Sequence, residues 1–543
     1  MLDTYKKFLV NITPREYQIK IAQECINKNC LVILPTGVGK TLIALILTID
    51  RLMKFPSEKV LFLAPTRPLS EQHLKYFKSH LTELFAQMEV FTGKISAEKR
   101  VKLWQKADII FSTPQCIAND LKNNLYTLEN VSLLIEDEAH RCIKNYAYTF
   151  VAKQYSIQAK NKRILGLTAS PGTDKKVIKT ICENLLIESV EIRTRESEDV
   201  KKYLQRINFN HVSVELTNEL VNVRSNLNEL FTKKVEELKK RNLLFGPPTK
   251  LNLLETQRRI MRSLATGNRN FNLMAGASVC AQALKLQHAI ELLETQTLFS
   301  LENYLSSLIK QANESKNKAV KKVVSNEKFL SAYYNVQKMI SNNIEHPKIE
   351  SLKGIIENKY KLNDKLKAIV FSQYRDSVIK ICKELNTLTG IKAKVFVGQA
   401  KKTSLKSNSG LSQKEQQQII EDFSNGIFNI LCATSIGEEG LDIPEVNLVI
   451  FYEPVPSAIR KIQRAGRTAR LIPGEIIFLI TKGTRDEAYY WAARSKEKKM
   501  NYALEEIQRD LKEKNNKPKE NTQKEEKDKN MEKQRRISDF LNN

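Results

Sequence analysis

Short apolar runs alternate with longer amphipathic or charged stretches over residues 31–167. Apolar runs of three to five residues bounded by turn signals are typical of buried strands, and the stretches between them are typical of helices. Their alternation predicts a parallel α/β sheet. The runs are LVIL (31–34), VLFLA (60–64), IIF (109–111), LLI (133–135) and ILGL (164–167).

A second series of the same kind begins at residue 368 and predicts a second α/β domain. Its runs are AIVF (368–371), KVFV (394–397), NILC (429–432), NLVIF (447–451) and EIIFLI (475–480).

Residues 215–340, between the two series, lose the strand pattern. Leu286, Ala289, Ile290 and Leu293 fall at i, i+3, i+4 and i+7, which is one face of a helix, so we expect a helical insertion. After about residue 505 the composition turns to Lys, Glu, Asn and Gln, and order should fade. The expected domains are 1–200 (first α/β), 201–345 (all-helical), 346–504 (second α/β) and 505–543 (disordered tail).

The chain is basic, with 88 Lys and Arg against 61 Asp and Glu, a net charge of +27. Such a balance favours a polyanionic partner, most often nucleic acid, although a Lys-rich proteome produces it too. Basic residues cluster in the predicted insertion, where they form either a nucleic-acid surface or a solvated face of a helical spacer. They are Lys233, Lys234, Lys239, Lys240, Arg241, Arg258, Arg259, Arg262, Lys316, Lys318, Lys321 and Lys322.

The eight cysteines are scattered without a C-x-x-C, which argues against a structural zinc site or a disulfide framework. The N-terminal segment lacks an apolar signal core, and the longest apolar run, 42–47, is too short to span a bilayer. We therefore expect a cytoplasmic protein without membrane contact, nucleoid-associated if it binds DNA.

The segment LPTGVGKT (34–41) follows the first strand directly and fits the end of the phosphate-loop pattern, although Leu34 stands where the general pattern has Gly. The glycines let backbone N–H groups surround phosphates, Lys40 reaches the β- and γ-phosphates, and the Thr41 hydroxyl binds Mg²⁺. The simpler alternative is a Gly-rich strand–helix turn.

The segment LLIEDEAH (133–140) places carboxylates at the end of another buried strand, where ligands bind in open α/β sheets. Asp137 is expected to hold Mg²⁺, and Glu138 to orient and deprotonate the attacking water. By itself an acidic pair is usually a solvated turn, but together with a phosphate loop it indicates nucleotide hydrolysis.

The segment QRAGRTAR (463–470) brings three arginines to roughly one helix face. Hydrolysis of a nucleotide between two domains needs an arginine from the second domain to neutralise transition-state charge, and Arg467 and Arg470 are the candidates. The alternative is a solvated basic face.

Taken together, these segments resemble the superfamily 2 helicases, in which two RecA-like domains close on ATP. The resemblance covers residues 1–500 and follows that family's motif order. The motifs are REYQ (15–18), LPTGVGKT (34–41), APTRPLSEQ (64–72), TG (92–93), STPQ (112–115), DEAH (137–140), TAS (168–170), VFSQYR (370–375), ATSIGEEGLDIP (433–444) and QRAGRTAR (463–470), with Ala469 where many relatives have Gly.

The resemblance implies roles for individual residues. Contacts to ATP and Mg²⁺ are implied for Arg15, Gln18, Pro35, Thr36, Gly37, Gly39, Lys40, Thr41, Asp137, Gly437, Asp442 and Gln463. Contacts to a nucleic-acid strand are implied for Arg67, Thr92, Gly93, Thr113, Gln373 and Thr434, on phosphates rather than bases, because a translocating motor must ignore sequence. Coupling of nucleotide state to domain closure is implied for His140, Thr168 and Ser170.

A closer likeness is to the Hef-type archaeal helicases and the Fanconi anaemia M helicase. That group carries a helical insertion between its RecA-like domains, and HPKIESL (346–352) also resembles its members. It implies a motor on forked or branched DNA in replication-fork repair and recombination. No acidic nuclease signature follows residue 500, so we expect no DNA cleavage. Dicer-type and RNA-sensing helicases have a similar insertion, so a duplex-RNA motor stays open, as does a non-catalytic nucleic-acid scaffold, which the intact catalytic residues disfavour.

The C-terminal tail ends in QRRISDFL (534–541), an apolar cluster after a polar leash. Gln534, Ile537, Phe540 and Leu541 resemble the peptide that docks on sliding clamps (PCNA), with Leu541 where that pattern usually has a second aromatic. One helical turn would point Ile537, Phe540 and Leu541 into a single apolar pocket. The alternative is a frayed helix that packs on its own domain.

Overall fold

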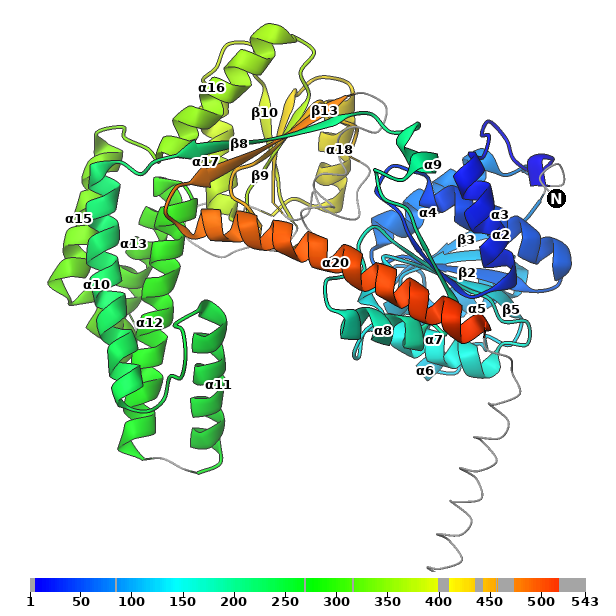
Figure 1. Cartoon of the computed structure of the whole chain (residues 1–543), viewed down its shortest axis with the longest axis horizontal. Coiled ribbons are helices and arrows are strands. Elements are labelled where there is room, and N and C mark those ends of the chain that lie inside the picture. The colour runs from blue at the N-terminus through cyan, green and yellow to red at the C-terminus, as the bar shows by residue number, and fades with distance from the viewer. Residues whose placement is uncertain are drawn as a thin grey trace, which may run out of the picture. The chain divides into compact units, whose positions relative to one another are not determined.

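The structure is a computed structural model that describes residues 5–83, 85–267, 270–314, 317–398, 410–434, 443–455, 457 and 473–516 (Figure 1). The chain divides into two compact units. Unit 1 comprises Met1–Tyr203 and Lys496–Asn543, and unit 2 comprises Leu204–Ser495.

Unit 1 is built on a seven-stranded parallel sheet with the strand order β3-β4-β2-β5-β6-β1-β7. The central strands are buried on both faces, which is why they appear in the sequence as continuous apolar runs rather than alternating patterns. The strands are β1 (Cys30–Ile33), β2 (Lys59–Leu63), β3 (Met88–Phe91), β4 (Ile109–Ser112), β5 (Val131–Asp137), β6 (Ile164–Thr168) and β7 (Ser189–Ile192).

The helices of unit 1 connect these strands (Figure 1). The apolar run at 42–47 lies in α3, which is buried from Leu42 to Leu52 and so forms part of the core. The helices are α2 (Glu16–Asn27), α3 (Lys40–Lys54), α4 (Arg67–His80), α5 (Ala97–Lys106), α6 (Pro114–Lys122), η1 (Ala139–Arg141), α7 (Ala147–Gln158), α8 (Lys175–Asn184) and α9 (Glu198–Lys201).

Unit 2 contains a six-stranded parallel sheet with the order β10-β11-β9-β12-β13-β8. Its strands are β8 (Ile207–Val214), β9 (Ala368–Phe371), β10 (Ala393–Phe396), β11 (Ile430–Ala433), β12 (Leu448–Phe451) and β13 (Gly474–Thr481). Helices α16 (Pro347–Leu362), α17 (Arg375–Leu385) and α18 (Gln413–Ser424) belong to the same α/β part.

Strand β8 was not predicted, since residues 201–345 were expected to be all-helical. It pairs with β13 over eight residues, from Ile207↔Gly474 to Val214↔Thr481. It is the outermost strand, and most of its side chains are exposed. An edge strand of this kind carries no apolar run, and the sequence pattern therefore does not predict it.

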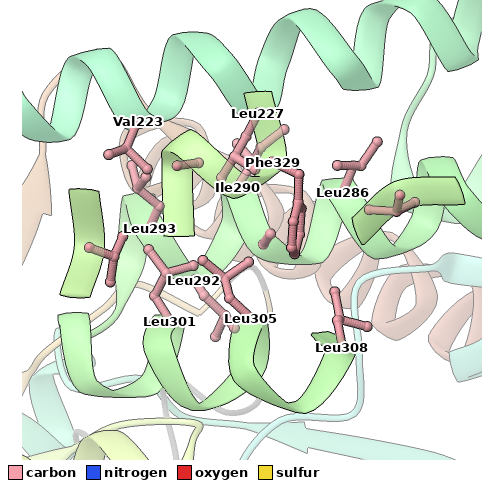
Figure 2. Packing of buried hydrophobic residues seen from close by; sticks show 14 of the residues in the cluster. Val223, Leu227, Leu286, Ile290, Leu292, Leu293, Leu301, Leu305, Leu308 and Phe329 are labelled. Carbon is pink, nitrogen blue, oxygen red and sulfur yellow. The ribbon is translucent and has the colours of Figure 1, made fainter. Parts of the chain in front are cut away.

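The predicted helical insertion is a bundle (Figure 2). Leu286, Ala289, Ile290 and Leu293 are all buried on one face of α12, as their spacing predicted. They pack against Val223 and Leu227 of α10, Leu301, Leu305 and Leu308 of α13, and Phe329 of α15. The helices are α10 (Asn218–Lys240), α11 (Lys250–Ala265), α12 (Phe271–Thr295), α13 (Leu298–Glu314), α14 (Lys318–Val324) and α15 (Glu327–Ser341).

Two parallel-sheet folds with a helical bundle between them in the chain confirm the predicted fold class, whereas the exact domain limits stay a prediction. Order persists beyond the expected residue 505, because α20 (Arg485–Asn516) continues to Asn516. Within unit 1, its residues Met500, Leu504 and Ile507 are buried, and Lys175 Nζ lies 3.4 Å from Asp510 Oδ2. The high Lys and Glu content thus conceals one apolar helix face. The tail, 517–543, lies outside the described residues.

Candidate active site

Three predicted motifs converge at the carboxyl edge of the sheet in unit 1. Strands β5, β6 and β1 are neighbours, and each leads directly into one motif. The register pairs Asp137 with Leu167 and Ile33 with Thr168. The phosphate-loop segment, the DEAH segment and the TAS segment therefore share one half of this edge, which is where open α/β sheets bind ligands.

The loop that follows β1 has the backbone of a phosphate-binding loop. Gly37 (φ 81°) and Gly39 (φ 78°) both adopt left-handed conformations that disfavour other residues. A Cβ on Gly39 would lie 2.3 Å from Gln18 Nε2, so any other residue here would also displace the Gln18 side chain from its hydrogen bond to Val38 O. Lys40 begins α3, and its Nζ donates to Leu34 O (3.0 Å) and Pro35 O (3.3 Å), which holds the ammonium over the loop.

Gln18 ties the start of α2 to this loop. Its Nε2 donates to Val38 O (3.1 Å), and its Oε1 accepts from Arg15 N (2.8 Å). Tyr17, which the motif analysis did not single out, donates its hydroxyl to the same Val38 O (2.6 Å). The Arg15 guanidinium stacks 4.6 Å from the centre of the Tyr203 ring. The segment predicted to contact adenine thus also supports the backbone of the loop that follows β1.

Asp137 is buried, and its Oδ2 lies 2.9 Å from Nε2 of His73 on α4. Burial acts to raise the pKa of the Asp137 carboxyl, but the hydrogen bond to His73 and the charges of His73 and Lys40 outweigh it and lower that pKa overall. The carboxyl therefore stays ionised, as a Mg²⁺ ligand must. Motif analysis missed His73, which follows Arg67 by six residues on the same helix.

We predict that His73→Ala raises the pKa of Asp137, because the variant loses the interactions that lower it. The acid limb of the pH–rate profile for ATP hydrolysis should then move to higher pH, and more Mg²⁺ should be needed at pH 6. His80→Ala, on the same helix, is the matched control and should leave the profile in place. An unshifted acid limb in His73→Ala would remove His73 from the site.

Glu136 precedes Asp137 and Glu138 in the sequence, but its side chain does not belong to the candidate active site. Residues adjacent in a strand point to opposite faces of the sheet, so its side chain faces away from that of Asp137. Glu136 is fully buried beside Cys142, and burial raises its pKa to about 8. A neutral carboxyl on the other face of the sheet is not a metal ligand.

Glu138 and His140 connect the DEAH segment to the TAS segment. The backbone of Glu138 is left-handed (φ 52°), an uncommon and strained conformation that is typical of functional turns. His140 Nδ1 lies 3.2 Å from Glu138 Oε2 and 3.1 Å from Thr168 Oγ1. Thr168 Oγ1 also accepts from the Ser170 amide (3.1 Å), and the Ser170 hydroxyl contacts Met500 Sδ (3.0 Å) on α20. The three predicted coupling residues, His140, Thr168 and Ser170, are thus joined by hydrogen bonds, and His140 lies close to the carboxylate of the predicted base.

The predicted strand-contacting residues of unit 1 lie on the other half of the same sheet edge. Arg67 begins α4 after β2, Thr92 and Gly93 follow β3, and Thr113 is the N-cap of α6 after β4. Strands β3, β4 and β2 are consecutive in the sheet, so these residues line up beside the half that carries the phosphate-loop, DEAH and TAS segments. Helix α4 carries both Arg67 and His73, and so joins the two halves through Asp137.

In unit 2, Gln373 and Thr434 follow the adjacent strands β9 and β11, whose last residues are paired. Gln373 is exposed, and its backbone N–H donates to Glu453 Oε1 (2.6 Å). The remaining predicted residues of this part of the chain lie outside the described residues. They are Gly437, Asp442, Gln463, Arg467 and Arg470. The predicted clamp-binding residues of the tail, Gln534, Ile537, Phe540 and Leu541, also lie outside the described residues.

The segment HPKIESL contains a buried charge whose partner the sequence did not reveal. Lys348 and Asp486 form an ion pair with both side chains 0% exposed. Lys348 Nζ also donates to Tyr452 O (2.9 Å) and Thr295 O (3.3 Å). One side chain thus joins the start of α16 to the ends of α12 and β12 and to α20.

Comparison with known proteins agrees with this geometry. Residues 15–178 match the DEAD/DEAH box helicase family, residues 347–472 the helicase conserved C-terminal domain, and residues 219–343 the helical bundle of ATP-dependent RNA helicases. The crystal structure of the Pyrococcus furiosus Hef helicase domain is similar, with 44% identity and a TM-score of 0.67 over 89% of this chain and 98% of that one.

Three curated relatives are similar over most of this chain. A Methanocaldococcus jannaschii protein named as an ATP-dependent RNA helicase is 40% identical over 91% of this chain and 61% of its own length. The ATP-dependent DNA helicase mph1 of Neurospora crassa is 34% identical over 91% of this chain and 43% of its own. The mouse Fanconi anemia group M protein homolog is 32% identical over 91% of this chain and 26% of its own. The chain thus spans less than two thirds of each.

The matched families cover the phosphate-loop and DEAH segments in residues 15–178 and the helical bundle in residues 219–343. The chain belongs to the superfamily 2 helicase ATPases of the Hef and Fanconi anaemia M type. Among the described helices, none combines the length and the apolar character that a membrane crossing requires.

Proposed function

We propose that this chain is an ATP-dependent DNA helicase or translocase that acts on forked or branched DNA in replication-fork repair and recombination. One observation carries the proposal: the predicted nucleotide contacts and strand contacts of unit 1 lie side by side on one sheet edge, joined by α4 through the His73–Asp137 hydrogen bond. The likeness to the Hef helicase domain and to the DNA helicase mph1 supports DNA as the substrate.

ATP and Mg²⁺ suit the residues present. Lys40 would meet the β- and γ-phosphates, and Thr41 and Asp137 would hold Mg²⁺, which neutralises charge on the phosphates. Glu138, at the turn after β5, would orient the attacking water and take its proton. Arg467 and Arg470 are proposed to complete the site from the second RecA-like domain. The Glu138–His140–Thr168–Ser170 chain would report the nucleotide state to the rest of the protein.

The strand contacts are proposed to grip phosphates rather than bases. Arg67, Thr92, Gly93 and Thr113 offer a guanidinium, hydroxyls and backbone N–H groups, which are the usual donors to a nucleic-acid backbone. Gln373 and Thr434 would extend this track in unit 2. Contacts to phosphates carry no sequence information, as a translocating motor requires.

A duplex-RNA motor is the second candidate, because the M. jannaschii relative and the bundle family carry RNA helicase names. The deciding experiment compares ATP hydrolysis stimulated by fork DNA, plain duplex DNA and duplex RNA of equal length. We expect stimulation in the order fork DNA, then duplex DNA, with little from RNA. If duplex RNA stimulates hydrolysis most, the protein is an RNA motor and the DNA proposal is wrong. If no nucleic acid stimulates hydrolysis, a non-catalytic nucleic-acid scaffold becomes the favoured function.

Basic side chains of the bundle are proposed to contact the DNA backbone. Lys233, Lys234 and Arg241 form ion pairs with acidic residues of α10, whereas Lys239 and Lys240 are exposed at the end of that helix. We predict that Lys239→Gln/Lys240→Gln weakens DNA binding at low salt and reduces the slope of log affinity against log salt by roughly two. Lys361→Gln, an exposed lysine of α16, is the control. If the slope of log affinity against log salt does not change, these lysines do not contact DNA, and the bundle is better explained as a helical spacer.

The C-terminal tail is proposed to bind a sliding clamp (PCNA), which would place the motor at replicating DNA and raise its local concentration there. We predict that a peptide of residues 528–543 binds the clamp of its own organism and that Phe540→Ala abolishes binding. In the full chain the same variant should keep its DNA-stimulated ATP hydrolysis. No heat of binding at high micromolar clamp would contradict the proposal. Such a protein would be cytoplasmic and nucleoid-associated.

A further inference from the structure

The last turns of α11 and the first turn of α12 lie at the end of the helical bundle that points away from the sheet of unit 2 (Figure 1). Three apolar side chains of these turns are exposed. Phe271 is 83% exposed, Met274 57% and Met261 54%. Phe271 and Met274 stand three residues apart on α12, so their exposed side chains are neighbours, and soluble proteins seldom leave large apolar side chains grouped in water unless the surface has a partner. We call the surface formed by Met261, Phe271 and Met274 the bundle tip.

The bundle tip is a defined arrangement. Phe271 and Met274 stand at i and i+3 in the first turn of α12, so they share one helix face. Asn272, between them, accepts a hydrogen bond from Arg241 Nη1 (3.2 Å) and donates to Arg241 O (3.2 Å). These bonds fix the start of α12 beside the end of α10. Met261 lies on the last turns of α11, which packs along α12.

A small core holds the three helix ends in place. Leu238 of α10, Ile260 of α11 and Val279 of α12 are buried in one cluster behind the tip. Gly276 of α12 allows Leu243 to approach, since a Cβ there would lie 2.0 Å from Leu243 Cδ1. The exposed residues are therefore presented by a packed scaffold.

The charge around the tip selects the kind of partner. Residues 239–274 contain eight Lys and Arg but a single acidic residue, Glu255. Lys239, Lys240 and Arg262 are exposed and have no ion-pair partner in the part of the chain that the structure describes. The N-terminus of α12 adds the positive end of a 25-residue helix dipole. A surface that combines apolar side chains with nearby positive charge matches nucleic acid, in which the apolar faces of bases lie beside negatively charged phosphates.

We propose that the bundle tip stacks on unpaired bases at a DNA junction: Phe271 and Met274 cover the base face, while Lys239, Lys240 and Arg262 bind the flanking phosphates. The inference rests on the proposed function, and it names the feature that distinguishes a fork from a plain duplex. Backbone contacts alone treat a duplex and a fork arm alike, whereas a stacking side chain needs a base whose face is open.

The test measures the affinity of full-length Phe271→Ala for a fork with unpaired arms and for a blunt duplex of the same length. Loss of one stacked base should weaken fork binding by about 5- to 150-fold. Blunt-duplex binding should change less than twofold, and the salt slope should not change because no charge is removed. Phe271→Trp should restore fork binding. Tyr334→Ala, which removes another exposed aromatic of the bundle (63%), is the control and should match the wild type.

A 2-aminopurine placed at the junction reports stacking directly. Its fluorescence should fall on binding the wild type and Phe271→Trp, but not Phe271→Ala. Equal fork affinity and equal fluorescence in Phe271→Ala would overturn the inference while DNA-stimulated ATP hydrolysis still upheld the proposed function. If instead no DNA stimulates the wild type, the proposed function itself fails. Loss of fork binding without a fluorescence difference would also overturn stacking, because Phe271 would then contribute to fork binding through another kind of contact.

Discussion

Replacement of Lys40 by alanine is expected to lower DNA-stimulated ATP hydrolysis by at least about a hundredfold. Lys40 is the first residue of α3, directly after the left-handed Gly39, and its ammonium lies over the loop carbonyls of Leu34 and Pro35. No other lysine occupies the loop. The variant therefore loses the cation that positions the β- and γ-phosphates and balances charge as the bond to the γ-phosphate breaks.

The matched control is Lys54→Ala at the other end of α3. Lys54 is half-exposed and pairs with Asp50 Oδ1 at 2.9 Å, so its removal tests the loss of a lysine from the same helix without touching the loop. Hydrolysis should be measured at saturating fork DNA. We expect the wild type, Lys40→Ala and Lys54→Ala to bind DNA with the same affinity when no nucleotide is present. If Lys40→Ala still hydrolyses ATP at a rate within a few-fold of the wild type, this loop is not the phosphate-binding loop.

Replacement of Lys348 by methionine is expected to cost unit 2 about 3–5 kcal/mol of unfolding free energy. The substitution keeps the length of the side chain but leaves the Asp486 carboxylate buried without its cation. Burial already acts to raise the pKa of Asp486, so the carboxyl has no favourable solvation of its own. The carbonyl oxygens of Tyr452 and Thr295 lose a donor at the same time.

The chain has two tryptophans, and this allows each unit to be followed separately. In a Trp104→Phe background, Trp491 of α20 reports urea unfolding of unit 2. Lys361→Met on the same helix α16 is the control, since its exposed pair with Glu357 (3.0 Å) should contribute less than about 1 kcal/mol. The double variant Lys348→Met/Asp486→Leu should recover part of the loss, because no lone charge remains buried. An unfolding free energy within 1 kcal/mol of the wild type in Lys348→Met would show that the pair is dispensable.

The sequence by itself determined the chemistry-bearing segments of unit 1. A phosphate loop depends on local features, namely a strand end, glycines with positive φ and a helix start, and all of these lie within residues 30–41. The same holds for DEAH at the end of β5. The four-residue spacing that predicted α12 is local too, and the buried Leu286, Ala289, Ile290 and Leu293 confirm it.

Only the tertiary structure decided which distant residues complete these segments. His73 meets Asp137 across 64 residues, Lys348 meets Asp486 across 138, and Ser170 meets Met500 across 330. Strand β8 was missed because an exposed edge strand carries no apolar run. The continuation of α20 was missed because its Lys- and Glu-rich composition outweighed the narrow apolar face formed by Met500, Leu504 and Ile507. Local patterns report residue type and spacing along the chain. The pairing of a buried charge depends on its distance and desolvation in space, which the fold alone sets.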